Sequence, residues 1–419
     1  MAHFGIVCPP LTGHVDPAAA VGRALIARGH RVTMFHVRDL EAKALSEGLE
    51  FRSLADREFP PGMLAESLAR MESLSGLASL KFAIAEECRI SELILKHGPE
   101  AIRSAGIDAM LVDQNTPAAA SVAQFLGLPF LSMCTSLPLN REPLIPPPFV
   151  GWQFSESIFA RCRNAVANSI AGRLIQPINR TINSYRLRWK LSPIRTPDDS
   201  FSPLAQIAQM PLTFDFPRQH LPRSFHYLGP WFDSARDEVP FPFERLDGRP
   251  LIYGSVGTLQ TANHRFFAIM AEACVKLNGQ LVVSLGKKTS VSVPALPGNA
   301  IAVSYAPQLA LISRAAAVIT HSGMNTTQQS LFFGVPAVAL PITHDQPAIA
   351  ARLARTGAGI VIPPAKLSPD LLYVALRAVT ARDSSYGLAA KRLRDEIRIS
   401  GGRERAADIA EQLLGRVVS

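Results

Sequence analysis

The sequence predicts an α/β protein made of two doubly wound domains that face each other across a cleft. Apolar runs of strand length alternate with helix-like runs in both halves of the chain. An irregular stretch rich in Pro, Asp and Phe separates the two halves. The length of 419 residues suits two domains. Strand–helix–strand units of this kind build right-handed parallel sheets.

The first half opens with the strand "HFGIVCPP". The following run predicts a helix with Asp16 as its N-cap, Pro17 at the first helical position and Gly29 at its end. The strand "RVTMFHV" completes the unit, which repeats as "IDAMLVDQ", "TPAAASVAQFLG" and "LPFLSM". Residues 60–105 are expected to be mostly helical, and residues 152–190 to form one or two further helices.

The second half restarts the pattern after the irregular stretch. Strands are expected at "PLIYGSVGT", "QLVVSLG", "NAIAVSYAP", "AAAVITHSG", "GVPAVALPITH" and "AGIVIPP". We therefore divide the chain into a first domain at residues 1–230, a linker at 231–248 and a second domain at 249–400. Residues 401–419 are expected to form a C-terminal helix, and its packing against the first domain is left open.

The composition indicates a globular protein without a membrane-spanning segment. No apolar run reaches the ~18 residues of a transmembrane helix, and the N-terminus has no signal-peptide pattern. The five cysteines show neither metal-type nor disulfide spacing, which is typical of a reducing cytoplasm. The formal charge is +9, but no nucleic-acid motif accompanies it, so we expect no nucleic-acid partner.

The turn "THSGMN" carries the first candidate site. His321 and Asn325 can donate hydrogen bonds, and Gly323 lets an anion approach the backbone. A helix N-terminus adds outward N–H groups and a partial positive charge. The turn on its own fits a phosphate site and an ordinary helix cap equally well.

Two neighbouring turns extend this interpretation. Asp345 and Gln346 end "ALPITHDQ", and a carboxylate beside an amide suits the vicinal hydroxyls of a sugar. Tyr305 and Gln308 in "SYAPQ" offer a flat ring and an amide for a base. Residues suited to bind a base, a phosphate and sugar hydroxyls thus follow one another along the chain. This order indicates a nucleotide-sugar site. Taken without the other residues, Tyr305 would be interpreted as a structural, half-buried aromatic residue at the end of a strand.

The run from Tyr305 to Gln346 resembles the signature of the family 1 glycosyltransferases, which use UDP-sugars. Its segments are "YAPQ", "THSGMNT", "GVP" and "PITHDQ". The resemblance implies the GT-B architecture, with two Rossmann-like domains of which the first binds the acceptor and the second the nucleotide-sugar. It also implies donor-binding residues at Gly13, Thr258, Tyr305, Gln308, His321, Gly323, Asn325, Thr326, Gln329, Asp345 and Gln346.

The resemblance gives most of these residues a part of the donor. It implies uracil and uridine contacts for Tyr305 and Gln308, diphosphate contacts for His321, Gly323, Asn325 and Thr258, and sugar-hydroxyl contacts for Asp345 and Gln346. Gln329 departs from the family, which usually has a Glu that grips the ribose, so we expect a looser nucleotide preference. Gln346 favours glucose over galactose.

The same resemblance assigns the chemistry to His14 in "PPLTGHVDP" and Asp113 in "AMLVD". His14 matches the catalytic base that follows the first strand, and Asp113 matches the acid that orients it. Such a base inverts the anomeric centre in one displacement. A His at a strand–helix junction is otherwise more often a cap or a polar filler. No D-x-D motif occurs, so we expect no metal and no other cofactor beyond the co-substrate UDP-glucose.

Several stretches resemble the bacterial zeaxanthin glucosyltransferases of carotenoid biosynthesis. They are "LVDQNTPAAASVAQFLGLPF", "SLPLNREPLIPPP", "FSPLAQIAQM" and "FPRQHLPRSFHYLGP". The resemblance implies transfer of glucose to the ring hydroxyls of a xanthophyll. Another aglycone (polyketide, sterol or polyphenol) stays open, as do a nucleotide-sugar binder without activity, a UDP-sugar epimerase, the number of glucosylated ends and the oligomeric state.

The segment from Arg161 to Arg195 concentrates the positive charge. It carries eight Lys or Arg residues, with apolar residues interleaved, and no Asp or Glu. We consider two alternatives: peripheral docking on an anionic membrane surface, and a solvated helix face whose apolar side packs the domain.

Overall fold

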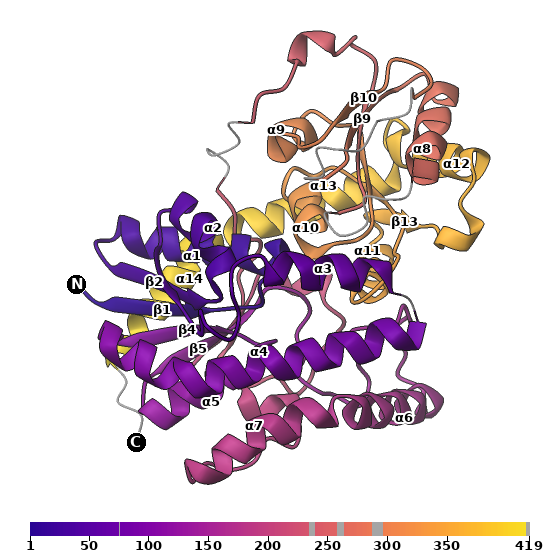
Figure 1. Ribbon diagram of the computed structural model, residues 1–419. Helices are drawn as coiled ribbons and strands as arrows, with labels where there is room; N and C mark the ends of the chain where they lie inside the picture. The colour runs from indigo at the N-terminus through magenta and orange to yellow at the C-terminus, as the bar shows by residue number, and fades with distance from the viewer. Residues whose placement is uncertain (75, 234–238, 258–263, 287–295, 416–419) are drawn as a thin grey trace.

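The computed structural model describes residues 1–74, 76–233, 239–257, 264–286 and 296–415. Within these residues the chain forms two wholly parallel sheets, one of seven strands and one of six, each covered by helices (Figure 1). The predicted fold class of two doubly wound α/β domains is confirmed.

The first sheet has the strand order β3-β2-β1-β4-β5-β6-β7. Its strands are β1 (His3–Val7), β2 (Arg31–His36), β3 (Glu50–Ser53), β4 (Ala109–Asp113), β5 (Phe130–Cys134), β6 (Gln206–Ala208) and β7 (Phe225–Tyr227). The order reverses between β1 and β4, and ligands of such sheets bind beyond the strand ends at that point.

Helices of the first domain are α1 (Thr12–Ala27), α2 (Glu41–Ser46), α3 (Met63–Ser73), α4 (Gly76–Ala105), α5 (Pro117–Leu126), α6 (Ile158–Leu174) and α7 (Gln176–Arg188). The helical character expected over residues 60–105 and 152–190 is confirmed. None of the helices within the described ranges is long and apolar enough to cross a membrane.

The start of α1 differs from the prediction. Leu11 is extended, and its carbonyl accepts from the backbone N–H groups of His14 and Val15, so the helix already begins at Thr12. Asp16 is therefore not the N-cap, and Pro17 lies inside the helix. His14 consequently lies on the first turn of α1 rather than before the helix.

The second sheet has the order β10-β9-β8-β11-β12-β13, reversing between β8 and β11. Its strands are β8 (Leu251–Ser255), β9 (Gln280–Ser284), β10 (Ile301–Val303), β11 (Ala317–Thr320), β12 (Ala337–Ala339) and β13 (Gly359–Val361). Its helices are α8 (His264–Lys276), α9 (Gln308–Ile312), α10 (Met324–Phe332), α11 (Gln346–Thr356), α12 (Pro369–Thr380) and α13 (Ser385–Ile399).

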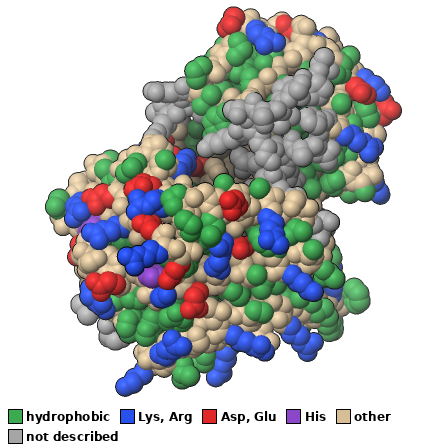
Figure 2. Space-filling view, in the orientation of Figure 1, with side chains coloured by type: hydrophobic (Ala, Val, Ile, Leu, Met, Phe, Trp, Pro, Cys, Tyr) green, Lys and Arg blue, Asp and Glu red, His purple; other side chains and the backbone are tan. Residues whose placement is uncertain are grey.

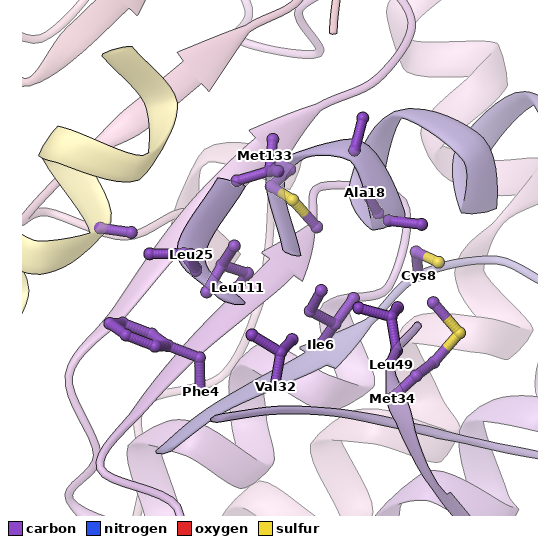
Figure 3. Packing of buried hydrophobic residues seen from close by; sticks show 14 of the residues in the cluster. Phe4, Ile6, Cys8, Ala18, Leu25, Val32, Met34, Leu49, Leu111 and Met133 are labelled. Carbon is purple, nitrogen blue, oxygen red and sulfur yellow. The ribbon is translucent and has the colours of Figure 1, made fainter. Parts of the chain in front are cut away.

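The core of the first domain lies between α1 and its sheet. Phe4, Ile6, Leu25 and Met34 pack there with almost no exposure (Figure 3). The last helix, α14 (Gly402–Glu411), returns to this domain and packs against α1. Its small apolar side chains complete the core: Ala406, Ala407, Ile409 and Ala410.

The two domains also share a core. A single buried cluster joins Cys134, Met210 and Phe214 of the first domain to strands and helices of the second. Beside it, Asp215 bonds to Arg352 of α11 through an Nε–Oδ1 contact of 2.8 Å. Buried apolar contacts and an ion pair thus join the two domains directly.

Candidate active site

His14 and Asp113 meet at the switch point of the first sheet. His14 lies on the first turn of α1, and Asp113 is the last residue of β4. Nδ1 of His14 is 2.9 Å from Oδ2 of Asp113, whose side chain is fully buried. The His14 side chain is 19% exposed, so the ring is held on one side and open on the other.

Thr135, which the sequence analysis missed, completes this pair. It follows β5, and its Oγ1 donates to Oδ2 of Asp113 at 2.5 Å while lying 2.7 Å from Nδ1 of His14. Oδ1 of Asp113 accepts from the backbone and side chain of Asn115 at 2.8 and 3.1 Å. The available signal was a polar residue directly after a predicted strand, the same signal that marks Asp113.

These contacts set the charges of the pair. Burial alone would raise the pKa of Asp113, but attraction to His14 and the hydrogen bonds outweigh burial and lower it. Burial alone would lower the pKa of His14, but the Asp113 carboxylate, with smaller contributions from Asp345 and Glu87, outweighs burial and raises it. An ionised Asp113 accepts the Nδ1 proton of His14, which leaves Nε2 with a lone pair for a base.

His321 lies on the turn between β11 and α10, against two glycines. A Cβ atom at Gly257 or Gly323 would lie 2.7 or 2.6 Å from Nε2 of His321, which is too close for either position to carry a side chain without moving the ring. Burial lowers the pKa of His321 to about 4, so the ring is neutral at pH 7. The His321 ring can therefore offer hydrogen bonds but no positive charge at this pH.

Asn325 connects this turn to the first domain. Its Oδ1 accepts from Nε2 of Gln209 at 3.0 Å, and the same nitrogen donates to the carbonyl of Thr135. Its Nδ2 donates to the carbonyl of Gly13 at 3.4 Å. Pro17 has no N–H for that carbonyl four residues earlier, which leaves the carbonyl available across the cleft.

Asp345 and Gln346 lie at the start of α11. Ser136, next to Thr135, donates its hydroxyl proton to Oδ2 of Asp345 across the cleft. Oε1 of Gln346 accepts from the backbone N–H groups of Ile342 and Thr343 at 2.8 and 2.9 Å. The side-chain amide oxygen of Gln346 thus stabilises the turn that precedes α11.

The expected base-reading residues gather around α9. Nε2 of Gln308 donates to Oε1 of Gln329 at 2.5 Å and to Oγ1 of Thr326 at 3.3 Å. The hydroxyl of Tyr253 donates to Oε1 of Gln308 at 2.9 Å. Tyr305 lies on the preceding turn with 46% of its side chain exposed. Thr258, the remaining expected donor residue, lies outside the described residues.

Metal ligands do not gather anywhere in the described chain: no three His, Cys, Asp or Glu side chains there lie close enough to hold an ion. Metal independence stays a prediction.

Comparison with known proteins gives the family. Residues 268–413 match the family described as "Erythromycin biosynthesis protein CIII-like, C-terminal domain". The chain is 34% identical to the zeaxanthin glucosyltransferase of Pantoea ananas over 99% of this chain and 96% of that protein. The zeaxanthin glucosyltransferase of Pseudescherichia vulneris is 32% identical, over 99% and 98%. The chain belongs to the family 1 glycosyltransferases.

Solved glycosyltransferases share the fold. The glycotransferase of kitacinnamycin superposes with a TM-score of 0.76 at 23% identity, covering 99% of both chains. The calicheamicin glycosyltransferase gives 0.76 at 20% identity over the whole of both chains. VinC, solved in complex with dTDP, gives 0.71 at 18% identity over 99% of this chain and 100% of its own. The glycosyltransferase therefore has the GT-B fold, as the sequence resemblance implied.

Proposed function

We propose that this glycosyltransferase is an inverting, metal-independent glucosyltransferase that transfers glucose from UDP-glucose to a hydroxyl of a lipophilic acceptor, the xanthophyll zeaxanthin. The observation that carries the proposal is the His14–Asp113 pair at the switch point of the first sheet. Ser136 and Gln209, which follow neighbouring strands of the same sheet, donate hydrogen bonds to Asp345 and Asn325 of the second domain. A nucleotide-sugar binder without activity needs no such base.

In the proposed reaction His14 is the general base. Asp113 and Thr135 hold Nδ1, and Nε2 removes the proton of the acceptor hydroxyl. The oxygen attacks the anomeric carbon from the face opposite the diphosphate, the bond to UDP breaks, and an α-linked donor gives a β-glucoside. Asp113 stabilises the imidazolium that forms.

The leaving diphosphate is proposed to bind at the N-terminus of α10. The first N–H groups of a helix have no partner within the helix, and its dipole favours an anion there. His321 and Asn325 supply further hydrogen bonds, and the absence of side chains at Gly257 and Gly323 leaves room for the His321 ring. Donors fixed in advance stabilise developing charge without a metal.

The acceptor is inferred from the names of the relatives and not from the geometry of the site. Two relatives named zeaxanthin glucosyltransferase match this chain over nearly its full length, and their name supports zeaxanthin as the acceptor. A second candidate is transfer to another small aglycone, with a looser choice of nucleotide. It is favoured by the match to an erythromycin-biosynthesis family and by the uncharged Gln308–Gln329 contact.

One experiment separates these candidates. The purified enzyme is incubated with UDP-glucose or dTDP-glucose and with zeaxanthin, a sterol, a polyphenol or a polyketide, and the products are identified by mass. The proposal expects a mass gain of one or two hexoses on zeaxanthin with UDP-glucose. Transfer to the other aglycones but not to zeaxanthin establishes the second candidate, and absence of transfer to any acceptor contradicts both. Activity should survive EDTA.

A further inference from the structure

The helices α6 and α7 form the lowest layer of the first domain in Figure 1. They differ in how much of their surface packs against the rest of the domain. α7 packs on α4 and α5, and Ile178, Ile182 and Trp189 belong to the core beneath it. Only two residues of α6 are buried, Ala160 and Asn164. The alternative of a packed apolar stripe therefore holds for α7 and not for α6.

The apolar side chains of α6 are exposed to solvent. Phe159, Val166, Ile170 and Leu174 recur at the spacing of one helix face. Their exposed fractions are 78%, 61%, 52% and 43%. A row of large apolar side chains on one helix of a water-soluble domain is unusual and typical of a surface that meets an apolar partner.

Cations surround this row. Six are exposed and form no ion pair with a carboxylate of the described chain: Arg161, Arg173, Arg180, Arg188, Lys190 and Arg195. Arg186, which the sequence analysis counted among them, is instead buried and donates to Oγ of Ser121 and to the carbonyl of Ser192 at 2.8 and 2.6 Å. Figure 2 shows Lys and Arg side chains mixed with hydrophobic ones along the lower edge of the molecule.

A groove between α6 and α7 adds a place for an anion. It has a volume of about 350 Å³ and is lined by Arg173, Arg180 and Arg195 together with Ser and Asn side chains, and by no acidic residue. Guanidinium groups bind phosphate oxygens in pairs of parallel hydrogen bonds. The groove therefore suits a phosphate headgroup.

We propose that α6 and the groove between α6 and α7 form a docking surface for a bilayer that contains anionic phospholipid. Lipid phosphates bind the cations, and the apolar face of α6 enters the boundary between headgroups and acyl chains. A nucleic acid would satisfy the cations but would leave the apolar row in water. The docking surface stands on its own geometry, so it does not depend on which acceptor the enzyme uses.

Co-sedimentation with vesicles tests the charges. Wild-type protein should bind vesicles of phosphatidylcholine with one quarter phosphatidylglycerol, weakly bind phosphatidylcholine alone, and dissociate as salt rises. Each cation near such a surface is worth about a fivefold change in binding, so the triple variant Arg161→Glu/Arg173→Glu/Arg180→Glu, which loses three cations and gains three anions, should bind at least about 100-fold more weakly. The matched control Lys366→Glu/Arg382→Glu/Arg398→Glu, with exposed cations of the second domain, should bind like wild type.

A second pair of variants tests the apolar face at constant charge. Phe159→Ser/Ile170→Ser should lose vesicle binding, whereas Leu371→Ser/Val374→Ser on α12, also exposed, should keep it. Hydrogen exchange of the wild-type protein on vesicles should protect residues 158–195, a measurement that does not require any variant to fold.

Equal binding to both vesicle types, protection elsewhere than residues 158–195, or equal losses in the control variants would overturn the proposal. So would full release by inorganic phosphate at constant ionic strength, which would reveal a site for soluble phosphate. Glucosyl transfer to a water-soluble alcohol should be unchanged in all four variants, which separates a failure of docking from a failure of the transferase assignment.

Discussion

Single side chains in the cleft set the protonation state of the base. Nδ1 of His14 is 2.9 Å from an ionised, buried Asp113, and the attraction raises the pKa of His14 against the effect of burial. His14 must be neutral to accept a proton. The rate should therefore rise with pH through a pKa above the usual histidine value of about 6.5.

Asp113→Asn removes the charge that raises this pKa. The acid limb of kcat/KM should move to lower pH, while kcat falls because the ring loses its orientation and the imidazolium its stabilisation. A pH–rate profile of both proteins measures this shift. Asp16→Asn, which removes a carboxylate from the same helix, should leave the limb unchanged. A limb that stays in place in Asp113→Asn would show that Asp113 does not set the pKa of the base.

Gly323 tests the diphosphate cradle. Its φ of −63° is open to any residue, so Gly323→Ala should fold, but the new Cβ would lie 2.6 Å from Nε2 of His321 and displace the ring. Loss of a fixed donor to a developing charge predicts a decrease in kcat/KM of about 10²-fold. Gly387→Ala, where the new Cβ would lie 4.0 Å from the Cβ of Ser384, an ordinary contact distance, should retain wild-type kinetics. Unchanged kinetics in Gly323→Ala would separate His321 from catalysis.

At the scale of strands and helices, the ends of β5 and β6 carry the residues that cross the cleft. Gln209 follows β6, is 1% exposed, and donates to Asn325 and to the carbonyl of Thr135. Gln209 thereby links the side-chain amide of Asn325 in the second domain to Thr135, the residue after β5 that contacts His14 and Asp113.

Gln209→Ala leaves both acceptors without this donor. We expect a stability loss of about 1–3 kcal/mol together with a higher KM for UDP-glucose. Gln206→Ala is the matched control, because Gln206 is a buried residue of β6 whose side chain bonds to Asn140 and Ser202 within the first domain. Denaturant midpoints and KM values of both variants decide the matter. An equal rise in KM in both would mean that Gln209 is only structural.

The sequence predicts apolar strands that end in turn residues well, and short strands with polar residues poorly. The strands that lead to His14, Asp113 and His321 follow from their apolar pattern and turn residues. β3, β6 and β7 were not predicted, because their sequences EFRS, QIA and FHY are short and partly polar, whereas the equally short β10, β11, β12 and β13 lie in apolar runs. Gln209 could not be predicted as a site residue, because its role depends on a partner more than a hundred residues away.

For the whole molecule, a buried ionic cluster holds the two domains together. Asp215 of the first domain accepts from Nε of Arg352 at 2.8 Å and from Nε of Arg218 at 2.6 Å. The guanidinium of Arg352 also lies 4.2 Å from the Phe216 ring centroid. The sequence could not predict this interface, since each residue alone resembles an ordinary surface charge.

Asp215→Asn should destabilise the molecule by about 3–5 kcal/mol, because it leaves buried arginines without a counter-charge. Burial would raise the pKa of Asp215, but the two arginines outweigh burial and hold it well below its usual range. Its contribution is therefore present above the unfolded value of about 4 and is lost as pH falls through the folded pKa.

Urea unfolding at pH 7 and at lower pH measures this contribution. Asp247→Asn, which removes a partly exposed ion pair with Arg249, should have a much smaller effect on stability, because solvent screens such pairs. Similar small effects of both substitutions would show that the Asp215 cluster does not hold the domains.

The central claim is that His14 is the base of a glycosyl transfer across this cleft. The most direct test is the single-turnover rate of His14→Ala, with UDP affinity measured by calorimetry on the same protein. We expect UDP to bind as in wild type and the rate to fall by about 10²–10⁴, while His97→Ala, at a half-buried histidine of α4 that pairs with Glu58, keeps the wild-type rate. A His14→Ala variant that binds UDP and transfers glucose at the wild-type rate would contradict the claim.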